Sequence, residues 1–94
     1  MITSTRYIYE RVGYGSRAMI FGSDGTIVRG RAAMEDKWTL DNDTLTILDH
    51  TGSVTCKLKK SDDGSYKGQW TRFEKCDVIL RPSLKQANFA LGLW

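Results

Sequence analysis

Turn signals divide this chain into runs that are too short to be anything but strands or brief connections. The runs are rich in Thr, Val, Ile, Tyr and Trp, which fit the pleated surface of a sheet. The clearest turn signals are Asp24-Gly25, Asp41-Asn42-Asp43, Thr51-Gly52 and Asp62-Asp63-Gly64. The pattern predicts eight strands, at residues 6–12, 17–22, 25–31, 36–41, 43–50, 53–60, 66–73 and 75–81.

The connections between these runs decide how neighbouring strands pair. A parallel pair needs a crossover of about a dozen residues or more, and none of the connections is that long. Neighbouring strands must therefore run antiparallel. Because a meander has two exposed edges that full closure would remove, we predict an all-β fold, an antiparallel meander of seven to eight short strands that closes into a small barrel. At 94 residues and 10.7 kDa, residues 1–94 are expected to form one domain.

Alternation of apolar and polar residues identifies the inner face. Leu45 and Ile47 share one face of their run, and Thr46 lies on the other. A barrel of eight strands has an interior that side chains fill or that holds one small ligand. Gly68, between Tyr66 and Trp70, either relieves crowding in that interior or marks a bend.

The chain changes character after Pro82, which cannot donate a backbone hydrogen bond and should end the last strand at residue 81. Residues 83–94 could form one helical turn, whereas Phe89, Leu91 and Leu93 recur at the period of a strand. Both readings stay open. Because apolar side chains are seldom left in water, we expect this tail to dock, either on the barrel or on a protein partner.

Charge is unevenly distributed. The net charge is +3 with a pI near 9.0. Arginines dominate residues 1–31, while residues 35–50 carry an acidic group, so we expect a surface with two poles, more often a solvated mixture than a binding site. The acidic residues are Glu35, Asp36, Asp41, Asp43 and Asp49. They interrupt any continuous basic stripe, which makes an OB-like nucleic-acid-binding domain unlikely.

Cysteine and histidine offer no metal or cofactor site. Cys56 and Cys76 each fall on the apolar face of a predicted strand, where free thiols behave as small hydrophobic groups. With one histidine they form no zinc ligand set. Free thiols suit a reducing compartment, so we expect a cytoplasmic protein. The chain has neither a signal peptide nor an apolar run of about 18 residues, and no contact with a membrane is expected.

No group of residues suggests catalysis. Asp49 and His50 are neighbours on one chain and point to opposite faces, so they do not form a natural dyad. The segment at residues 41–43 lacks the glycine and the distal glutamate of a calcium loop. Gly13-Tyr14-Gly15-Ser16 does not lead into a helix as phosphate-binding loops do. The sequence therefore predicts a protein that is not an enzyme.

One series of motifs resembles a known class of proteins. The motifs are Phe21-x-x-Asp24-Gly25-Thr26-Ile27, Trp38-Thr39-Leu40, Leu45-Thr46-Ile47, Gly52 and Tyr66-x-Gly68-x-Trp70. They resemble small lipocalin-like, or calycin-type, β-barrel modules, and are similar to accessory domains of bacterial glycosyltransferases and polysaccharide-related proteins. The resemblance spans residues 17–70. It implies a non-catalytic binding or accessory module, with a saccharide or another small polar or anionic molecule as its ligand.

Five residues are the candidate ligand-binding residues. Arg29 and Arg31 share one face of their run, and that face points inward if Ile27 does. Either a bulge near Gly30 turns the arginines outward, or they meet a carboxylate or an anionic ligand, since a buried arginine without a partner is very unfavourable. In the second case Trp38, Tyr66 and Trp70 would provide stacking surfaces; otherwise they pack the core. A protein partner or a homo-oligomer, through strand pairing or the tail, is the alternative to a small ligand.

Overall fold

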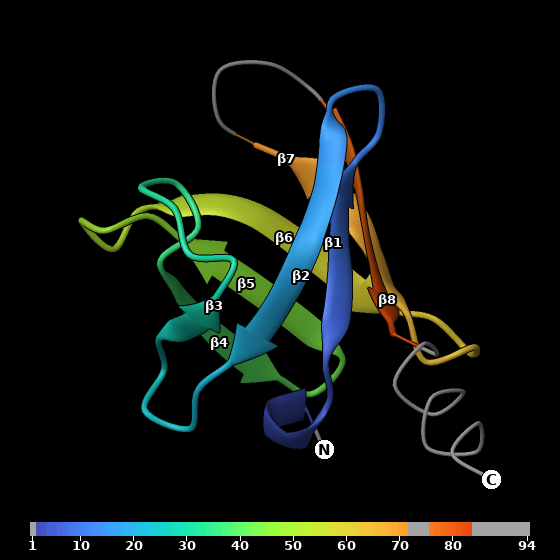
Figure 1. Ribbon diagram of the computed structural model, residues 1–94, viewed down its shortest axis with the longest axis horizontal. Helices are drawn as coiled ribbons and strands as arrows, with labels where there is room; N and C mark the ends of the chain where they lie inside the picture. Colours follow the sequence, from blue (N-terminus) through green and yellow to red (C-terminus); the bar gives the residue numbers. More distant parts are fainter. Residues whose placement is uncertain (1, 72–75, 84–94) are drawn as a thin grey trace, which may run out of the picture.

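Within the residues that the structure describes, the chain forms one antiparallel sheet of eight strands that curls into a nearly closed barrel (Figure 1). The structure is a computed structural model that describes residues 2–71 and 76–83. A short 3₁₀ helix, η1 (Ile2–Ser4), precedes the first strand. The strands are β1 (Tyr7–Arg11), β2 (Gly15–Phe21), β3 (Ile27–Arg29), β4 (Lys37–Asp41), β5 (Thr44–Leu48), β6 (Val54–Lys60), β7 (Tyr66–Trp70) and β8 (Cys76–Pro82). Each predicted strand overlaps an observed one.

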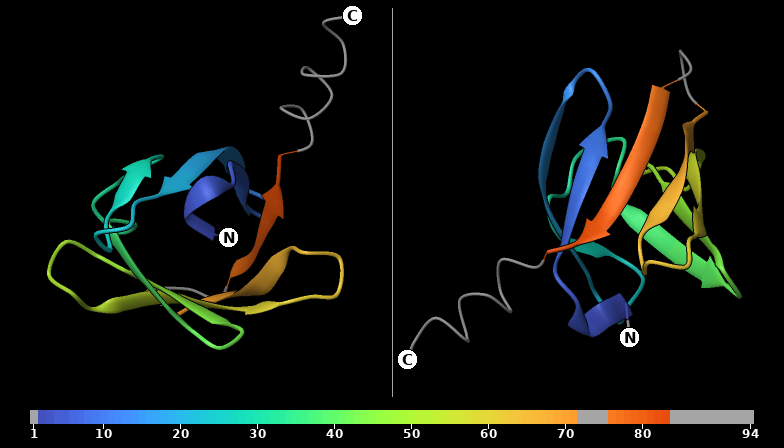
Figure 2. Two further views of the ribbon diagram at one scale, coloured as in Figure 1. Left: turned by 90° about the horizontal axis from the view of Figure 1, so that it is seen from below. Right: turned by 90° about the vertical axis from the view of Figure 1, so that its right-hand side faces the viewer.

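The order of the strands confirms the predicted meander and its closure. The sheet runs β3-β2-β1-β8-β7-β6-β5-β4, and every neighbouring pair is antiparallel. Strands β1 and β8 close the ring, with Tyr9 opposite Leu80. In Figure 2, β1 and β2 lie across the lumen from β5 and β6, and β8 joins the two sides. The ring is weakest between β3 and β4, the two end strands of the sheet.

Several strand ends differ from the prediction, and the end of β8 has a physical explanation. We expected the last strand to end at residue 81, but Pro82 is the final residue of β8 and lies opposite Tyr7. Proline lacks the N–H that a ladder uses, and a position at the end of a strand does not require that donor.

Three of the turns share one local device. Asp24, Asp49 and Asp63 each place a carboxylate oxygen within hydrogen-bond distance of the backbone N–H and the hydroxyl two residues later. The three sequences are Asp-Gly-Thr, Asp-His-Thr and Asp-Gly-Ser, in which the aspartate accepts and the Thr or Ser donates. An aspartate that bonds its own backbone in this way stabilises a turn. The connections predicted from Asp, Gly and Thr are therefore closed by side chains as well as by backbone geometry.

Aromatic side chains from four strands pack in series inside the barrel. The ring of Tyr7 lies 5.7 Å from that of Phe21 and 6.3 Å from that of Tyr66, and the Phe21 ring lies 5.6 Å from that of Trp38, all edge to face. Edge-to-face contacts are a favourable geometry for aromatic rings. The aliphatic core around them includes Met19, Ile27, Leu45, Ile47, Leu58, Val78 and Leu80. The burial of Leu45 and Ile47 confirms the inner face predicted for their run.

Gly68 is the point of closest approach between β6 and β7. A Cβ atom at Gly68 would lie 1.9 Å from the carbonyl oxygen of Lys57 and 2.9 Å from the Cα atom of Leu58. These distances leave no room for any side chain. Of the two roles predicted for this glycine, the relief of crowding is the one that the contacts describe, and the crowding comes from backbone rather than from the neighbouring aromatic rings.

Both cysteines are buried free thiols, as predicted. Cys56 and Cys76 lie opposite Trp70 on the two strands that flank β7. Two interstrand spacings separate their backbones by roughly 9–10 Å, beyond the reach of about 7 Å that a disulfide allows. Burial, followed by the nearby Glu35 carboxylate, raises the pKa of the Cys56 thiol to about 12.

The Cys56 thiol should be unreactive in the folded protein. In a Cys76→Ala variant, whose only thiol is Cys56, reaction with an aromatic disulfide reagent at pH 8 should be at least about 100-fold slower than in urea, because burial suppresses the thiolate and blocks access. The absorbance of the released thiol measures the rate. Equal rates in native and denaturing buffer would contradict the burial of Cys56.

Two expectations concern segments at the margin of the structure. None of the helices within the described residues is both long and apolar enough to cross a membrane. The docking tail predicted at residues 83–94 lies outside the described residues from residue 84 onward; Ser83 itself donates its backbone N–H to the carbonyl of Arg6 at 2.8 Å.

Candidate functional site

The seam between β3 and β4 is bridged by a loop instead of a ladder. We call residues 30–36 the seam loop. The two strands meet through one isolated bridge, Thr26 opposite Lys37, and through two backbone bonds beside it. Ile27 donates to the carbonyl of Asp36 at 2.9 Å, and Trp38 donates to the carbonyl of Gly25 at 3.0 Å. Since the seam has so few strand contacts, the side chains of the loop must hold it in place.

Glu35 anchors the inner side of the seam loop. Its side chain is buried, with the residue 4 % exposed. Arg17 donates from Nη2 to Glu35 Oε1 at 2.8 Å and from Nε to the carbonyl of Gly30 at 2.8 Å. The Tyr9 hydroxyl donates to Glu35 Oε2 at 3.3 Å, and the Arg17 guanidinium lies 5.1 Å from the centre of the Tyr9 ring. The loop is therefore tied to both β1 and β2.

The state of Tyr9 suits its role as a donor. Burial, reinforced by the charge of Glu35, raises the pKa of Tyr9 well above its ordinary value. The hydroxyl keeps its proton at any physiological pH, so it donates to a carboxylate that is paired with a guanidinium. A buried carboxylate is tolerated when it is paired and hydrogen-bonded in this way.

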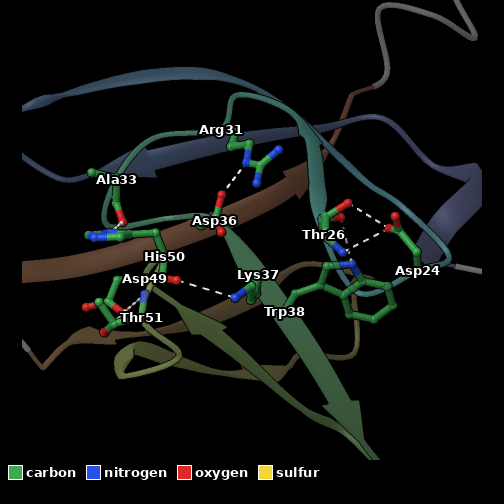
Figure 3. A network of polar contacts seen from close by, with 10 residues as sticks. All are labelled: Asp24, Thr26, Arg31, Ala33, Asp36, Lys37, Trp38, Asp49, His50 and Thr51. Atoms are coloured by element: carbon green, nitrogen blue, oxygen red, sulfur yellow. Dashed lines mark hydrogen bonds and ion pairs between the residues drawn. The ribbon is translucent and has the colours of Figure 1, made fainter.

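The outer side of the seam loop is tied to the turn at residues 49–53, as Figure 3 shows. Arg31 pairs with Asp36 within the loop, and this bond holds the pKa of the Asp36 carboxyl below its usual value. His50 donates its backbone N–H to the carbonyl of Ala33 at 3.1 Å, and its Nδ1 lies 3.3 Å from the same oxygen. Lys37 donates from Nζ to the carbonyl of His50 at 3.4 Å. The two connections therefore act as one rigid unit.

The Asp49 carboxylate holds its own turn closed. One of its oxygens accepts from the backbone N–H groups of Thr51 and Ser53, each at 2.9 Å, and from the Thr51 hydroxyl at 2.6 Å. His50, beside it, contacts the seam loop. The described contacts of Asp49 and His50 do not pair the two side chains, in agreement with the interpretation of His50 as a turn residue.

The predicted arginines are both exposed, and a β-bulge turns the first of them outward. Phe21 lies opposite Ile27, but the next pair joins Ile20 to Arg29, so Val28 is an extra residue on β3. A bulge of this kind reverses the alternation of faces. Ile27 is buried, whereas Arg29 and Arg31 are exposed. Of the two alternatives, the bulge describes Arg29, while Arg31, which lies beyond the end of β3, meets the carboxylate of Asp36.

The three predicted stacking residues occupy different environments. Tyr66 and Trp70 are buried in the core, 4 % and 6 % exposed. Trp38 is half-buried against the core, and its indole N–H donates to the carbonyls of Gly22 at 2.9 Å and Thr26 at 3.1 Å. The cation–π contacts of the described residues involve Arg11 and Arg17, not Arg29 or Arg31. The five candidate residues thus do not gather into one site.

Two expectations about charged residues need correction. We expected the acidic group of residues 35–50 to be a solvated pole, but Glu35, Asp36 and Asp49 are 4 %, 5 % and 2 % exposed. They hold turns together instead of facing water. We considered inward arginines at Arg29 and Arg31, whereas within the described residues it is Arg17 that reaches the buried Glu35. A sequence signal existed for a neighbouring group, because Arg11 is in phase with the buried Tyr7 and Tyr9.

Comparison with known proteins supports the fold and leaves the family open. No family model matches the chain, and no curated protein matches it by sequence. Among solved structures, an inhibitor of a psychrophilic marine protease, MP, has a similar fold, with a TM-score of 0.67 and 15 % sequence identity. The similarity covers 87 % of this chain and 96 % of the inhibitor. The nearly closed barrel agrees with the lipocalin-like resemblance, while nothing in these comparisons supports a relation to glycosyltransferase accessory domains.

Proposed function

We propose that this single β-barrel domain is a non-catalytic binding module whose partner is a protein, and that a protease is the class of partner to test first. The barrel resembles that of a protease inhibitor, which supports the choice of partner class. The observation that carries the proposal is the placement of the exposed apolar side chains of the described residues.

Among the described residues, four of the five exposed large hydrophobic side chains belong to one end of the barrel. In an up-and-down meander, the connections β1–β2, β3–β4 and β5–β6 emerge at the same end, which we call the loop end. Val12 and Tyr14 lie in the first of these connections. Val28 lies in β3, separated from the second connection only by Arg29, and Val54 is the first residue after the third. Leu40 lies toward the other end. Exposed apolar side chains with polar surroundings are typical of protein-binding surfaces.

The loop end is also rigid and carries suitable side chains. The seam loop is bonded to β1, β2 and the turn at residues 49–53, so its conformation is set before any partner arrives. A preorganised loop lowers the entropic cost of binding. Tyrosine and arginine are enriched among residues that dominate binding energy, and Tyr14 and Arg29 are both exposed here.

A saccharide or small anionic ligand at Arg29 and Arg31 is the second candidate. Arg29 favours it, because its side chain is exposed and has no ion-pair partner among residues 2–71 and 76–83. Burial of Tyr66 and Trp70 counts against it, since those rings are not available for stacking on a sugar. The same burial counts against a nucleic-acid-binding domain, which needs exposed aromatic rings on a basic sheet face.

The experiment is a titration of the purified chain into proteases of the serine, cysteine, aspartic and metallo classes. We expect inhibition at equimolar ratio for one class, with a one-to-one complex by light scattering and with the chain left intact. A Tyr14→Ser/Val28→Ser variant should bind at least about tenfold more weakly, because it loses two apolar contacts at the interface.

Leu40→Ser is the matched control, since it removes an exposed apolar side chain at the opposite end and should leave the affinity unchanged. Digestion of the chain by all four classes without a complex would overturn the protease partner. Saturable binding of a neutral oligosaccharide that is lost in Arg29→Gln would replace the proposal with the second candidate. Self-association of the chain alone by light scattering would identify a second copy as the partner.

A further inference from the structure

The loop end holds a hollow between two arginines, and of its lining residues only Tyr14 also belongs to the proposed protein-binding surface. It has a volume of about 220 Å³ and is lined by Arg11, Tyr14, Gly15, Ser16 and Arg17. Register explains why these residues meet. Arg11 lies opposite Gly15, and Tyr9 lies opposite Arg17. Because Tyr9 is buried in the core, the alternation of β1 directs Arg11 to the same inner side, at the mouth of the barrel.

Gly15 keeps this space open. Its φ is +147°, and a Cβ built on it would meet no atom within 4 Å. The position opposite Arg11 therefore has neither a side chain of its own nor a neighbour that fills the gap. The guanidinium of Arg11 borders a space that a small group could enter.

The Arg11 guanidinium is held in place by rings. Its central carbon lies 5.3 Å from the centre of the Tyr14 ring and 5.0 Å from the centre of the Trp70 ring. The described residues place no carboxylate against Arg11, whereas Arg17 pairs with Glu35 at 2.8 Å. The described part of the mouth thus carries two guanidinium groups and one carboxylate. Cation–π contacts position Arg11 without neutralising it.

The geometry points to an oxyanion-binding site in this hollow, with Arg11 as its principal donor. A guanidinium presents paired N–H donors that match the two oxygens of a carboxylate or of a phosphate. The volume is below the roughly 300–1,000 Å³ of sites that enclose whole ligands. The site therefore takes a single carboxylate or phosphate group, either as a small free anion or as the end of a larger molecule. It stands independently of the proposed protease partner.

The experiment titrates sodium acetate against sodium chloride at a constant ionic strength of about 0.15 M, so that general screening does not change. We follow the backbone amide resonances of Gly15 and Ser16, the Nε–H of Arg11 and the indole N–H of Trp70 by NMR. The expected result is a saturable shift of these four signals. Arg11→Gln should weaken binding at least about tenfold, and Arg11→Lys, which keeps the charge but not the paired donors, about threefold.

Arg6→Gln is the control, because it removes an exposed arginine that lies before β1, at the opposite end of the barrel, and it should leave the affinity for acetate unchanged. Sodium phosphate, and glutamate blocked at both ends, form the other arms. Blocked glutamate that binds as acetate does would identify the side chain of a protein as the source of the anion; acetate alone would identify a small free acid. Shifts that do not saturate, or that persist equally in Arg11→Gln and Arg11→Lys, would overturn the site.

Discussion

Gly68→Ala should lower the thermal midpoint by roughly 12–24 °C, because the added methyl group would collide with the backbone of β6. The added Cβ would lie 1.9 Å from the Lys57 carbonyl oxygen, so β6 and β7 would have to separate. Overpacking typically costs about 1–3 kcal/mol, and a clash with backbone belongs at or above the upper end. A cost of about 3 kcal/mol corresponds to that shift in a domain of this size.

Differential scanning calorimetry gives the midpoint, and Gln69→Ala is the neighbouring control. Gln69 is exposed on the same strand and donates to Asp77 at 3.1 Å, so its replacement should change the midpoint by only a few degrees. A Gly68→Ala variant that melts with the Gln69→Ala variant would show that β6 and β7 do not approach each other at this point.

Glu35→Ala should destabilise the protein by about 2–3 kcal/mol. The change removes the acceptor of both Arg17 and Tyr9, and it releases the seam loop from β1 and β2. Breaking a buried pair from one side costs about 3–5 kcal/mol, and the Arg17 side chain, 37 % exposed, can recover part of that through water. Urea unfolding followed by tryptophan fluorescence measures the free energy, and a loss below about 0.5 kcal/mol would contradict the anchoring role.

Arg17→Met and the double variant Arg17→Met/Glu35→Met test the pair itself. The single change leaves the Glu35 carboxylate buried and without its counter-ion, so it should be at least as destabilising as Glu35→Ala. The double change replaces the ion pair with two apolar side chains and should recover much of the loss. Additive losses in the two positions would show that Arg17 and Glu35 do not interact.

The sequence predicted the strands well because their signals are local. Alternation of side chains such as Leu45, Thr46 and Ile47 depends only on the residues of one strand, and the Asp-Gly turns depend on their own backbone. Antiparallel pairing followed from connection length alone. Closure of β1 against β8 followed from the need to cover two edges, which is a property of any meander of this length.

The candidate site was harder to predict because it depends on register. The extra residue Val28 turns Arg29 outward, and a bulge leaves no mark in the pattern until the pairing with Ile20 is known. Glu35 looked like a surface residue because carboxylates are seldom buried, and its partners Tyr9 and Arg17 lie 26 and 18 residues away. Arg11 was the exception, since its phase with Tyr7 and Tyr9 already placed it on the inner face.

The pairing of β1 with β8 has a consequence for how the chain reaches its native state. Each hairpin forms between residues that are close in sequence, but the ring closes only when Tyr7 meets Pro82, 75 positions later (82 − 7). Bringing such distant segments together is opposed by chain entropy, and proteins with many contacts of this kind refold slowly. Until that last pairing forms, two unsatisfied strand edges face water, and this intermediate is the form of the molecule most prone to aggregate.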